Sequence, residues 1–262
     1  MQRGPRMSVR LVVSVLLGWQ VALAVAQPAA GRRSGFDDMG RATQAMQRDD
    51  SQNPAMLWAQ EGSALWDRPA GRNNKACVDC HGAAAPGMRG VATRYPAFDQ
   101  SSQRVVNLAQ RINQCVETRQ QAPALAQESQ PLLALEAHVA RQSRGMPLAP
   151  PADPRLAPSL ALGQALFGQR IGQLNLSCAQ CHDERAGQRL GGSTIVQGHA
   201  TGYPLYRLEW QALGSLQRRL RNCMAGVRAD PYAFGAPELL ALEVYLAQRS
   251  AGMAWEAPAV RP

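Results

Sequence analysis

Two short stretches, Cys77-Val78-Asp79-Cys80-His81 and Cys178-Ala179-Gln180-Cys181-His182, share the pattern C-x-x-C-H. This pattern is typical of c-type haem attachment. Two thiols one helical turn apart can add to the two vinyl groups of one porphyrin, and the following histidine then reaches the iron from the same side. We therefore expect two covalent haems, held by Cys77, Cys80, Cys178 and Cys181, with His81 and His182 as proximal iron ligands.

Zinc is the main alternative for such a pattern. A zinc site would need further thiols or a second histidine close by, and neither half of the chain supplies an obvious set. The haem interpretation uses four of the six cysteines and leaves Cys115 and Cys223.

The chain is an internal repeat around these motifs. Leu132-Leu133-Ala134-Leu135-Glu136 recurs unchanged at 239–243, and Thr93-Arg94-Tyr95-Pro96 resembles Thr201-Gly202-Tyr203-Pro204. The offset is 101 residues through the motifs and 107 or 108 afterwards, so the second copy carries about seven extra residues just after its motif. A duplicated unit of roughly 100 residues has a common domain size.

Each copy has the periodicity of helices. Apolar residues recur at helical spacing from Val105 to Cys115 and from Leu213 to Val227, and residues 132–142 and 238–249 form further helical runs. No convincing strand alternation accompanies them. We predict an all-α fold of two tandem cytochrome c-like domains joined by a Pro-rich linker.

The proline-rich segment between Pro147 and Pro158 sets the expected domain boundary. Such a density of proline favours an extended, semi-rigid linker over a helix. We place the first domain at residues 35–147, the linker at 148–157 and the second domain at 158–255.

Residues 1–26 have the layout of a secretory signal peptide. Arg3, Arg6 and Arg10 precede an apolar run to Val25, and Ala24-Val25-Ala26 supplies small residues at the cleavage spacing. The run is shorter than the roughly 20 residues of a membrane-spanning helix, and no later segment is long and apolar enough. We expect a periplasmic protein with no membrane span in its mature form.

The charge balance indicates the class of partner. Removal of residues 1–26 lowers the formal net charge from +9 to +6, most of it from arginine. A basic surface rich in arginine suits oxyanions and acidic partners. The charges are scattered rather than clustered, so we do not expect nucleic acid as a partner.

Two pairs of residues could supply the distal iron ligands. Met146 and Met253 occupy matching places near the ends of the two copies, and methionine is a common distal ligand in cytochromes c. Cys115 and Cys223 also match one another. Spacing alone leaves both pairs open, and the cysteines could also be buried core thiols or form one disulfide between the copies.

An arginine precedes each of these cysteines by four residues: Arg111 before Cys115, and Arg219 before Cys223. Residues at this spacing share one face of a helix, and a guanidinium beside a thiol stabilises the thiolate. The alternative is that both arginines are solvated residues copied in the duplication.

The two motifs, the additional cysteine in each copy and the run Arg218–Arg228 together resemble the SoxA family. Members of this family are the dihaem subunits of SoxAX cytochrome complexes. The resemblance covers the chain from about Asp37 to Pro262, and its most specific part is the pattern Arg-x-x-x-Cys-x-x-x-x-Arg around Cys223.

The resemblance implies a role for particular residues. It implies Cys115 and Cys223 as the distal ligands of the first and second haem, and Cys223 also as the catalytic cysteine, present as a persulfide. It implies Arg219 as a substrate-binding residue, with Arg228 and Arg249 as further anion contacts. Because Arg111 has the same spacing in the first copy, the arginine at this spacing does not by itself mark the active site.

The activity implied by the resemblance is that of an L-cysteine S-thiosulfotransferase. Thiosulfate would be joined oxidatively to a cysteine of the carrier SoxYZ, and electrons would leave through haem to a soluble acceptor cytochrome. The expected partner is SoxX, a monohaem cytochrome c, in a heterodimer. Two alternatives stay open: a dihaem cytochrome that only transfers electrons, and a thiosulfate dehydrogenase that forms tetrathionate.

Overall fold

The computed structural model describes residues 31–262, together with Met1 and Gly4. The predicted signal peptide therefore lies almost wholly outside the described residues. Residues Arg33–Pro262 form one unit in which both halves of the repeat pack together. Within the described part of the chain, no helix is long and apolar enough to cross a membrane.

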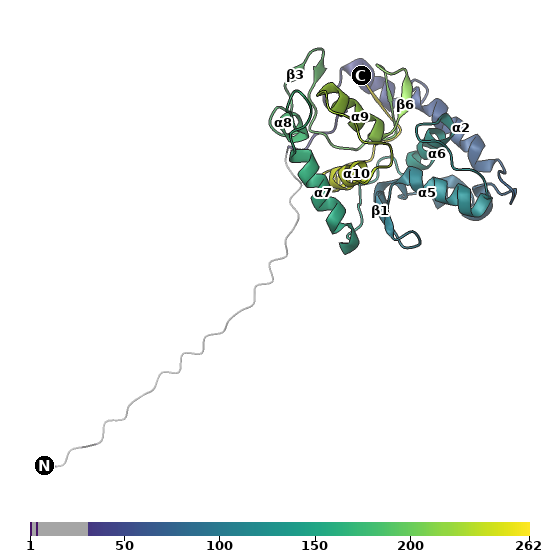
Figure 1. Cartoon of the computed structure of the whole chain (residues 1–262), viewed down its shortest axis with the longest axis horizontal. Coiled ribbons are helices and arrows are strands. Elements are labelled where there is room, and N and C mark those ends of the chain that lie inside the picture. Colours follow the sequence, from purple (N-terminus) through teal and green to yellow (C-terminus); the bar gives the residue numbers. More distant parts are fainter. Residues whose placement is uncertain (2–3, 5–30) are drawn as a thin grey trace. The chain divides into compact units, whose positions relative to one another are not determined.

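Each half of this unit contributes the same series of elements (Figure 1). The first half contains α2 (Ala55–Asp67), α3 (Val78–His81), β1 (Ala97–Asp99), β2 (Arg104–Val106), α5 (Leu108–Cys115) and α6 (Gln130–Arg141). The second half contains α7 (Ala157–Gly168), α8 (Cys178–His182), β5 (Leu205–Arg207), β6 (Ala212–Gly214), α9 (Leu216–Gly226) and α10 (Pro237–Arg249).

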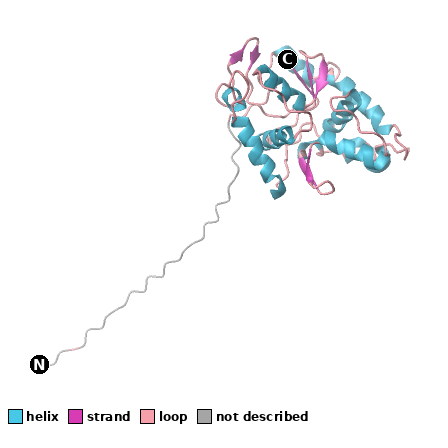
Figure 2. Cartoon of the chain, in the orientation of Figure 1, coloured by secondary structure: helices cyan, strands magenta, loops and turns pink. Residues whose placement is uncertain are grey.

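The remaining elements are short and are not all repeated. They are α1 (Arg41–Arg48), α4 (Ala84–Gly87), η1 (Ala92–Arg94), η2 (Val116–Gln120), η3 (Pro154–Leu156), β3 (Arg189–Leu190), β4 (Ser193–Thr194) and β7 (Ala259–Arg261). Figure 2 shows that helices dominate and that the strands are small additions. The predicted helical fold is thus confirmed, with short strands that the sequence pattern did not reveal.

One helix pair forms the centre of each half: α2 packs on α6, and α7 packs on α10. Glycine allows the helices to approach closely at the crossing. A Cβ atom on Gly62 would lie 2.0 Å from the carbonyl oxygen of Ala134, and one on Gly163 would lie 2.0 Å from that of Ala241. The same close contact at matching positions shows that the duplication extends to the packing of the backbone.

The two predicted helices that carry Cys115 and Cys223 begin later than their apolar periodicity indicated. Val105 lies in β2 and Leu213 in β6, and each strand forms an antiparallel hairpin with β1 or β5. The reason is helix capping: the Asn107 side chain accepts a hydrogen bond from the backbone of Gln110, and Ser215 accepts one from Arg218. These caps fix the starts of α5 and α9.

The proline-rich segment is more tightly held than a free linker. Leu148 is buried, and α7 already begins at Ala157 because a proline is tolerated in the first helical turn. Around Pro147, the chain pairs with the end of the second half in an antiparallel bridge to Ala254. In this bridge Trp255 N donates to Met146 O, and Leu148 N donates to Met253 O, both at 2.8 Å.

The two halves also share a hydrophobic core. One cluster combines Trp66, Leu108 and Leu148 from the first half and the linker with Trp255 and Ala257 from the end of the chain. The C-terminal strand β7 pairs in parallel with β5 and contacts α1, so the sheet β6-β5-β7 also contacts the beginning of the described chain. The two halves consequently form one packed unit and are not independent domains.

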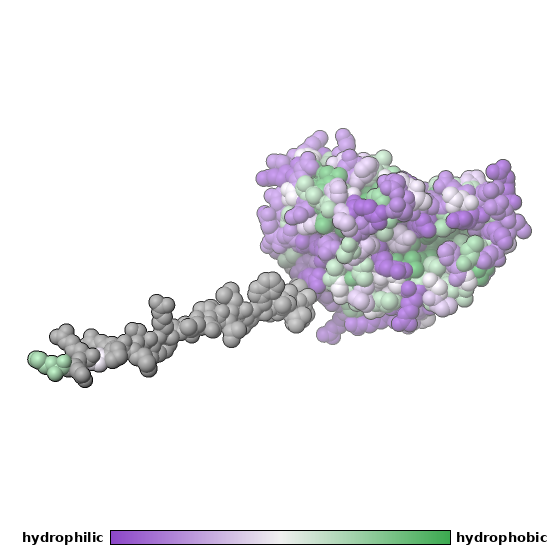
Figure 3. Space-filling model, turned by 90° about the horizontal axis from the view of Figure 1, so that it is seen from below, coloured by the Kyte–Doolittle hydropathy of each residue, from purple (hydrophilic) through white to green (hydrophobic). Residues whose placement is uncertain are grey.

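Figure 3 shows one face of the molecule in space-filling form. Hydrophobic residues gather in a few patches between larger hydrophilic areas. Elsewhere, large apolar side chains with high exposure include Leu57 on α2 and Leu190 on β3.

Candidate functional site

Both C-x-x-C-H motifs form a short helical turn, α3 in the first half and α8 in the second. The second turn is fixed by a capping box, in which Ser177 Oγ accepts from Gln180 N at 3.2 Å and Gln180 Oε1 accepts from Ser177 N at 2.9 Å. In the first, Asp79 takes the equivalent part by accepting from Ala76 N at 2.8 Å. The six cysteines of the chain are free thiols, so the possible disulfide between Cys115 and Cys223 is not formed.

His182, the predicted proximal ligand of the second half, is oriented by the loop that follows it. His182 Nδ1 lies 2.6 Å from the carbonyl oxygen of Val196, which requires the proton on Nδ1 and leaves Nε2 as the ligating nitrogen. Gly198 lies against the ring, where a Cβ atom would come within 3.1 Å of His182 Cγ. The extra residues of the second copy thus form a loop that positions His182.

Cys223 faces this histidine from α9. Burial acts to raise the pKa of Cys223, but a hydrogen bond with His182 and the positive charges of Arg219, His182 and Arg207 outweigh it, so the pKa lies below its ordinary value. A lowered pKa favours the thiolate, which is the form of cysteine that binds metals and attacks sulfur. The structure therefore brings together the predicted residues His182, Arg219 and Cys223.

The first half has a similar arrangement around its motif. Cys115 lies close enough to Cys77 to contribute, after burial, to raising the Cys77 pKa to about 11. Cys178 has the same relation to Cys223 in the second half, with a pKa also raised to about 11. The ring of Trp66 packs 5.7 Å from that of His81, at the position that Phe167 occupies 6.4 Å from His182.

The matching methionines, Met146 and Met253, lie at the contact between the two halves. The backbones of Met146 and Met253 form the bridge between the two halves, and the Met253 side chain packs against the shared core cluster. Met146 approaches Gly90. The choice of Cys115 and Cys223 over Met146 and Met253 as distal ligands stays a prediction.

Two further arginines with a predicted substrate role have other surroundings. Arg249 forms an ion pair with Asp183, donates to the Gln197 carbonyl oxygen at 3.1 Å and lies over the Phe167 ring. It therefore ties α10 to the loop beside His182. Arg228 is exposed and has φ 59°, like its counterpart Gln121 with φ 56°. The role of Arg228 and Arg249 as anion contacts stays a prediction.

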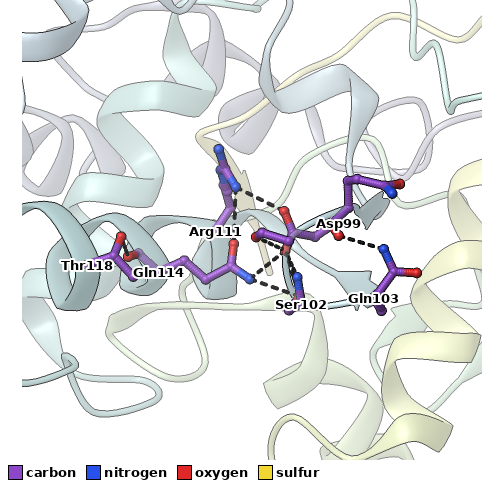
Figure 4. A network of polar contacts seen from close by, with 8 residues as sticks. Asp99, Ser102, Gln103, Arg111, Gln114 and Thr118 are labelled. Carbon is purple, nitrogen blue, oxygen red and sulfur yellow. Dashed lines mark hydrogen bonds and ion pairs between the residues drawn. The ribbon is translucent and has the colours of Figure 1, made fainter.

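Arg111, the counterpart of Arg219, is part of a polar network (Figure 4). Its Nη1 atom lies 3.1 Å from Asp99 Oδ1. Asp99 Oδ2 also accepts hydrogen bonds from Ser101, Ser102 and Gln114. The bonds from the serines hold the pKa of Asp99 well below its ordinary value, so this carboxylate stays charged beside Arg111.

The residues around the two C-x-x-C-H motifs fit haem c. Each half supplies two thiols one turn apart, and in the second half a histidine with a fixed tautomer and a cysteine with a lowered pKa face one another. A histidine nitrogen and a thiolate are both established ligands of haem iron.

Arg207 in β5 and the Val196 carbonyl group also belong to the site, although the sequence pattern did not predict them. Arg207 lowers the Cys223 pKa although 16 positions separate the two residues, and nothing in the motif points to it. The signal available in the sequence was the repeat itself, because the position that holds arginine in the second copy holds Asp99 in the first.

Comparisons with known proteins identify the family of this chain. The family model described as SoxA/TsdA, cytochrome c domain, matches twice, at residues 61–148 and 162–255. The L-cysteine S-thiosulfotransferase subunit SoxA of Rhodovulum sulfidophilum is 38% identical over 229 residues, which is 87% of this chain and 80% of that protein. The SoxA subunit of Pseudaminobacter salicylatoxidans is 34% identical over 221 residues, covering 84% of this chain and 77% of that protein.

A solved structure has the same fold. The crystal structure of SoxXA from P. pantotrophus matches with a TM-score of 0.85 and 30% identity, covering 88% of this chain and 87% of the matched chain. The two cytochrome c matches fall on the two halves of the repeat, and each contains one C-x-x-C-H motif. This chain belongs to the SoxA family of haem c proteins.

Proposed function

We propose that this chain is the SoxA-type subunit of a periplasmic L-cysteine S-thiosulfotransferase. It would couple thiosulfate oxidatively to a cysteine of a SoxYZ-like carrier protein. The observation that carries the proposal is the group around Cys223, a cysteine on α9 whose pKa is lowered by a hydrogen bond with His182 and by the charge of Arg219. The SoxA names of the relatives support the same reaction.

The chain would hold two haems. Cys77 and Cys80 would attach the first, with iron ligands His81 and Cys115. Cys178 and Cys181 would attach the second, with iron ligands His182 and Cys223. When bound, haem supplies an electron acceptor next to the reacting sulfur.

Each residue of the second site has a task in this reaction. Arg219 binds the sulfonate end of thiosulfate, because a guanidinium fork matches oxyanion geometry and charge. Cys223, as a persulfide, forms a bond to the outer sulfur of thiosulfate. The thiolate of the carrier then attacks that outer sulfur, takes the thiosulfate group and leaves the persulfide on Cys223.

The overall reaction balances. One S–S bond forms between the carrier thiol and thiosulfate, and one proton and two electrons leave. The proposed electron route includes a SoxX-like monohaem cytochrome c as heterodimer partner and a soluble acceptor cytochrome. The likeness to the SoxXA structure supports this partner.

The test is a carrier-loading assay with the holo-complex of this chain and its SoxX-like partner. The complex is mixed with thiosulfate, an oxidised acceptor cytochrome and the carrier, and the mass of the carrier is measured. We expect a thiosulfonate adduct with the wild type and none with Cys223→Ala. Met253→Leu, at the competing ligand position, should load the carrier like the wild type.

Three outcomes would contradict the proposal. Loading by Cys223→Ala would exclude the sulfur-carrying role. Tetrathionate as the only product would show a thiosulfate dehydrogenase. If the complex exchanges electrons with its acceptor but does not oxidise thiosulfate, the chain is a cytochrome that only transfers electrons.

A further inference from the structure

The two halves differ in what neutralises the arginine one turn before the distal cysteine. In the first half, Arg111 is in an ion pair with Asp99 at the end of β1. Asp99 is held by three residues of its own hairpin and α5, and its side chain is only 9% exposed. The carboxylate of Asp99 would repel an anionic substrate, and the charge of Arg111 is already neutralised by this carboxylate.

In the second half the same position carries the opposite charge. β5 matches β1 in register: Asp99 pairs with Arg104 across the first hairpin, and Arg207 pairs with Ala212 across the second. Both hairpins follow a Tyr-Pro sequence, and both have a glutamine at positive φ in the turn, Gln103 and Gln211. Arg207 therefore occupies the position of Asp99 and approaches Arg219 as Asp99 approaches Arg111.

Electrostatics is consistent with the placement of Arg207 that the strand register gives. Burial and the nearby charge of Arg219 lower the pKa of Arg207, and both arginines lower the pKa of Cys223. Arg207 therefore lies near enough to Arg219 for their two charges to interact. Among residues 31–262, no carboxylate lies within ion-pair distance of Arg219.

Arg207 is itself held in a defined orientation. Its Nε and Nη2 atoms donate to Glu209 Oε2 at 3.1 Å and 2.7 Å, and its guanidinium lies 5.4 Å from the Trp210 ring centre. The Arg207 side chain is 14% exposed, whereas that of Glu209 is 63% exposed. Glu209 therefore holds one edge of the guanidinium from the solvent side.

We propose that Arg207 is a second substrate-binding guanidinium, and that the exchange between aspartate at position 99 and arginine at position 207 decides which half binds thiosulfate. The inference rests on the proposed function, since it concerns the same site. Two half-buried guanidiniums repel one another when the site is empty. A dianion with three sulfonate oxygens relieves that repulsion and accepts hydrogen bonds from both.

The test compares Arg207→Gln with Arg218→Gln in the holo-complex. Arg218 is a matched control on α9, because its guanidinium lies over the same Trp210 ring, 4.4 Å from its centre, and the variant loses the same charge. We expect Arg207→Gln to raise the KM for thiosulfate by about ten- to a hundred-fold, as expected for loss of a charge-assisted hydrogen bond, with kcat changed less than threefold. Arg218→Gln should stay within about twofold of the wild type in KM.

Further variants separate binding from structure. Arg207→Lys should recover part of the affinity because it restores the charge without the fork, and Arg207→Asp, which copies the first half, should bind more weakly than Arg207→Gln. The haem spectrum and thermal melting of each variant show whether it is folded. The Kd of thiosulfate, measured without carrier, gives a readout that does not depend on turnover.

The results distinguish the inference from the proposed function. A wild-type complex that does not load the carrier would overturn the proposed function. If the wild type loads the carrier while Arg207→Gln keeps its KM, or loses only kcat, the inference about Arg207 is wrong.

Discussion

The two halves of the chain share a backbone and differ in a few side chains. Asn74 and Asn175 lie in matching turns and have similar backbone angles, with φ of 45° and 49°. The two central helix pairs also cross equally closely, at Gly62 and Gly163. The differences lie around the distal cysteine, where Asp99 is replaced by Arg207, and after the proximal histidine, where the second half has a longer loop. The comparison shows that a duplicated frame can keep its backbone while the charges around the matching cysteines Cys115 and Cys223 change.

The shared frame can be tested at its tightest contact. We expect Gly163→Ala and Gly62→Ala each to lower the free energy of unfolding by about 3 kcal/mol, because the added Cβ atom would lie 2.0 Å from a backbone oxygen and the helices must separate. The measurement is thermal or denaturant unfolding of the holo-protein.

Gly168→Ala on the same helix is the control. Its added Cβ atom would have no heavy atom within 4 Å, so the change should be neutral or slightly stabilising. A Gly163→Ala variant as stable as Gly168→Ala would contradict the close crossing of α7 and α10.

The difference between the halves can be tested at Asp99. We expect Asp99→Arg to add a second thiosulfate site beside Arg111, about tenfold weaker than the first, because the variant copies the charges of the second half. Calorimetric titration of the holo-complex with thiosulfate would measure the number of sites.

Asp99→Ala is the control, because it removes the carboxylate without adding a guanidinium. It should keep a single site and become slightly less stable, because the Arg111 ion pair and the serine hydrogen bonds are lost. A single site in Asp99→Arg as well would show that charge alone does not distinguish the halves.

A smaller effect is expected at the contact between the halves. Glu136 and Glu243 are matching residues that line one cavity of about 70 Å³, where Asn107 donates to Glu243 at 3.3 Å. Burial raises the pKa of Glu136 to about 8, with a contribution from Glu243, and burial raises the pKa of Glu243 to about 7.

These shifts predict the direction of a pH dependence. A carboxyl group with a raised pKa in the folded state favours folding when protonated, so stability falls as the pH rises from the ordinary value of 4.5 to about 8. Glu243→Gln should flatten this fall, and its advantage in Tm over the wild type should grow from about pH 5 to about pH 8. If the Tm of the two proteins changed with pH in parallel, the raised pKa of Glu243 in the folded state would be wrong.

Much of the site could be read from the sequence because its chemistry is local. The C-x-x-C-H spacing needs only one helical turn, and the repeat located Cys115 and Cys223 at matching positions. The helical runs at 132–142 and 238–249 agree closely with α6 and α10, because their apolar periodicity and Pro237 are local signals. The starts of α5 and α9 were misjudged, since apolar spacing continues through the hairpins and only the caps at Asn107 and Ser215 end it.

The sequence by itself determined the haem-attachment motifs, the duplication and the arginine one turn before each of Cys115 and Cys223. The tertiary structure alone decided which charges surround those arginines: Asp99 reaches Arg111, and Arg207 reaches Arg219 and Cys223. It also decided that Val196 fixes the tautomer of His182. The physical reason is separation along the chain. A motif encodes contacts within one or two helical turns, whereas the electrostatic field at a site is the sum over charged residues that strand pairing and loop folding bring together.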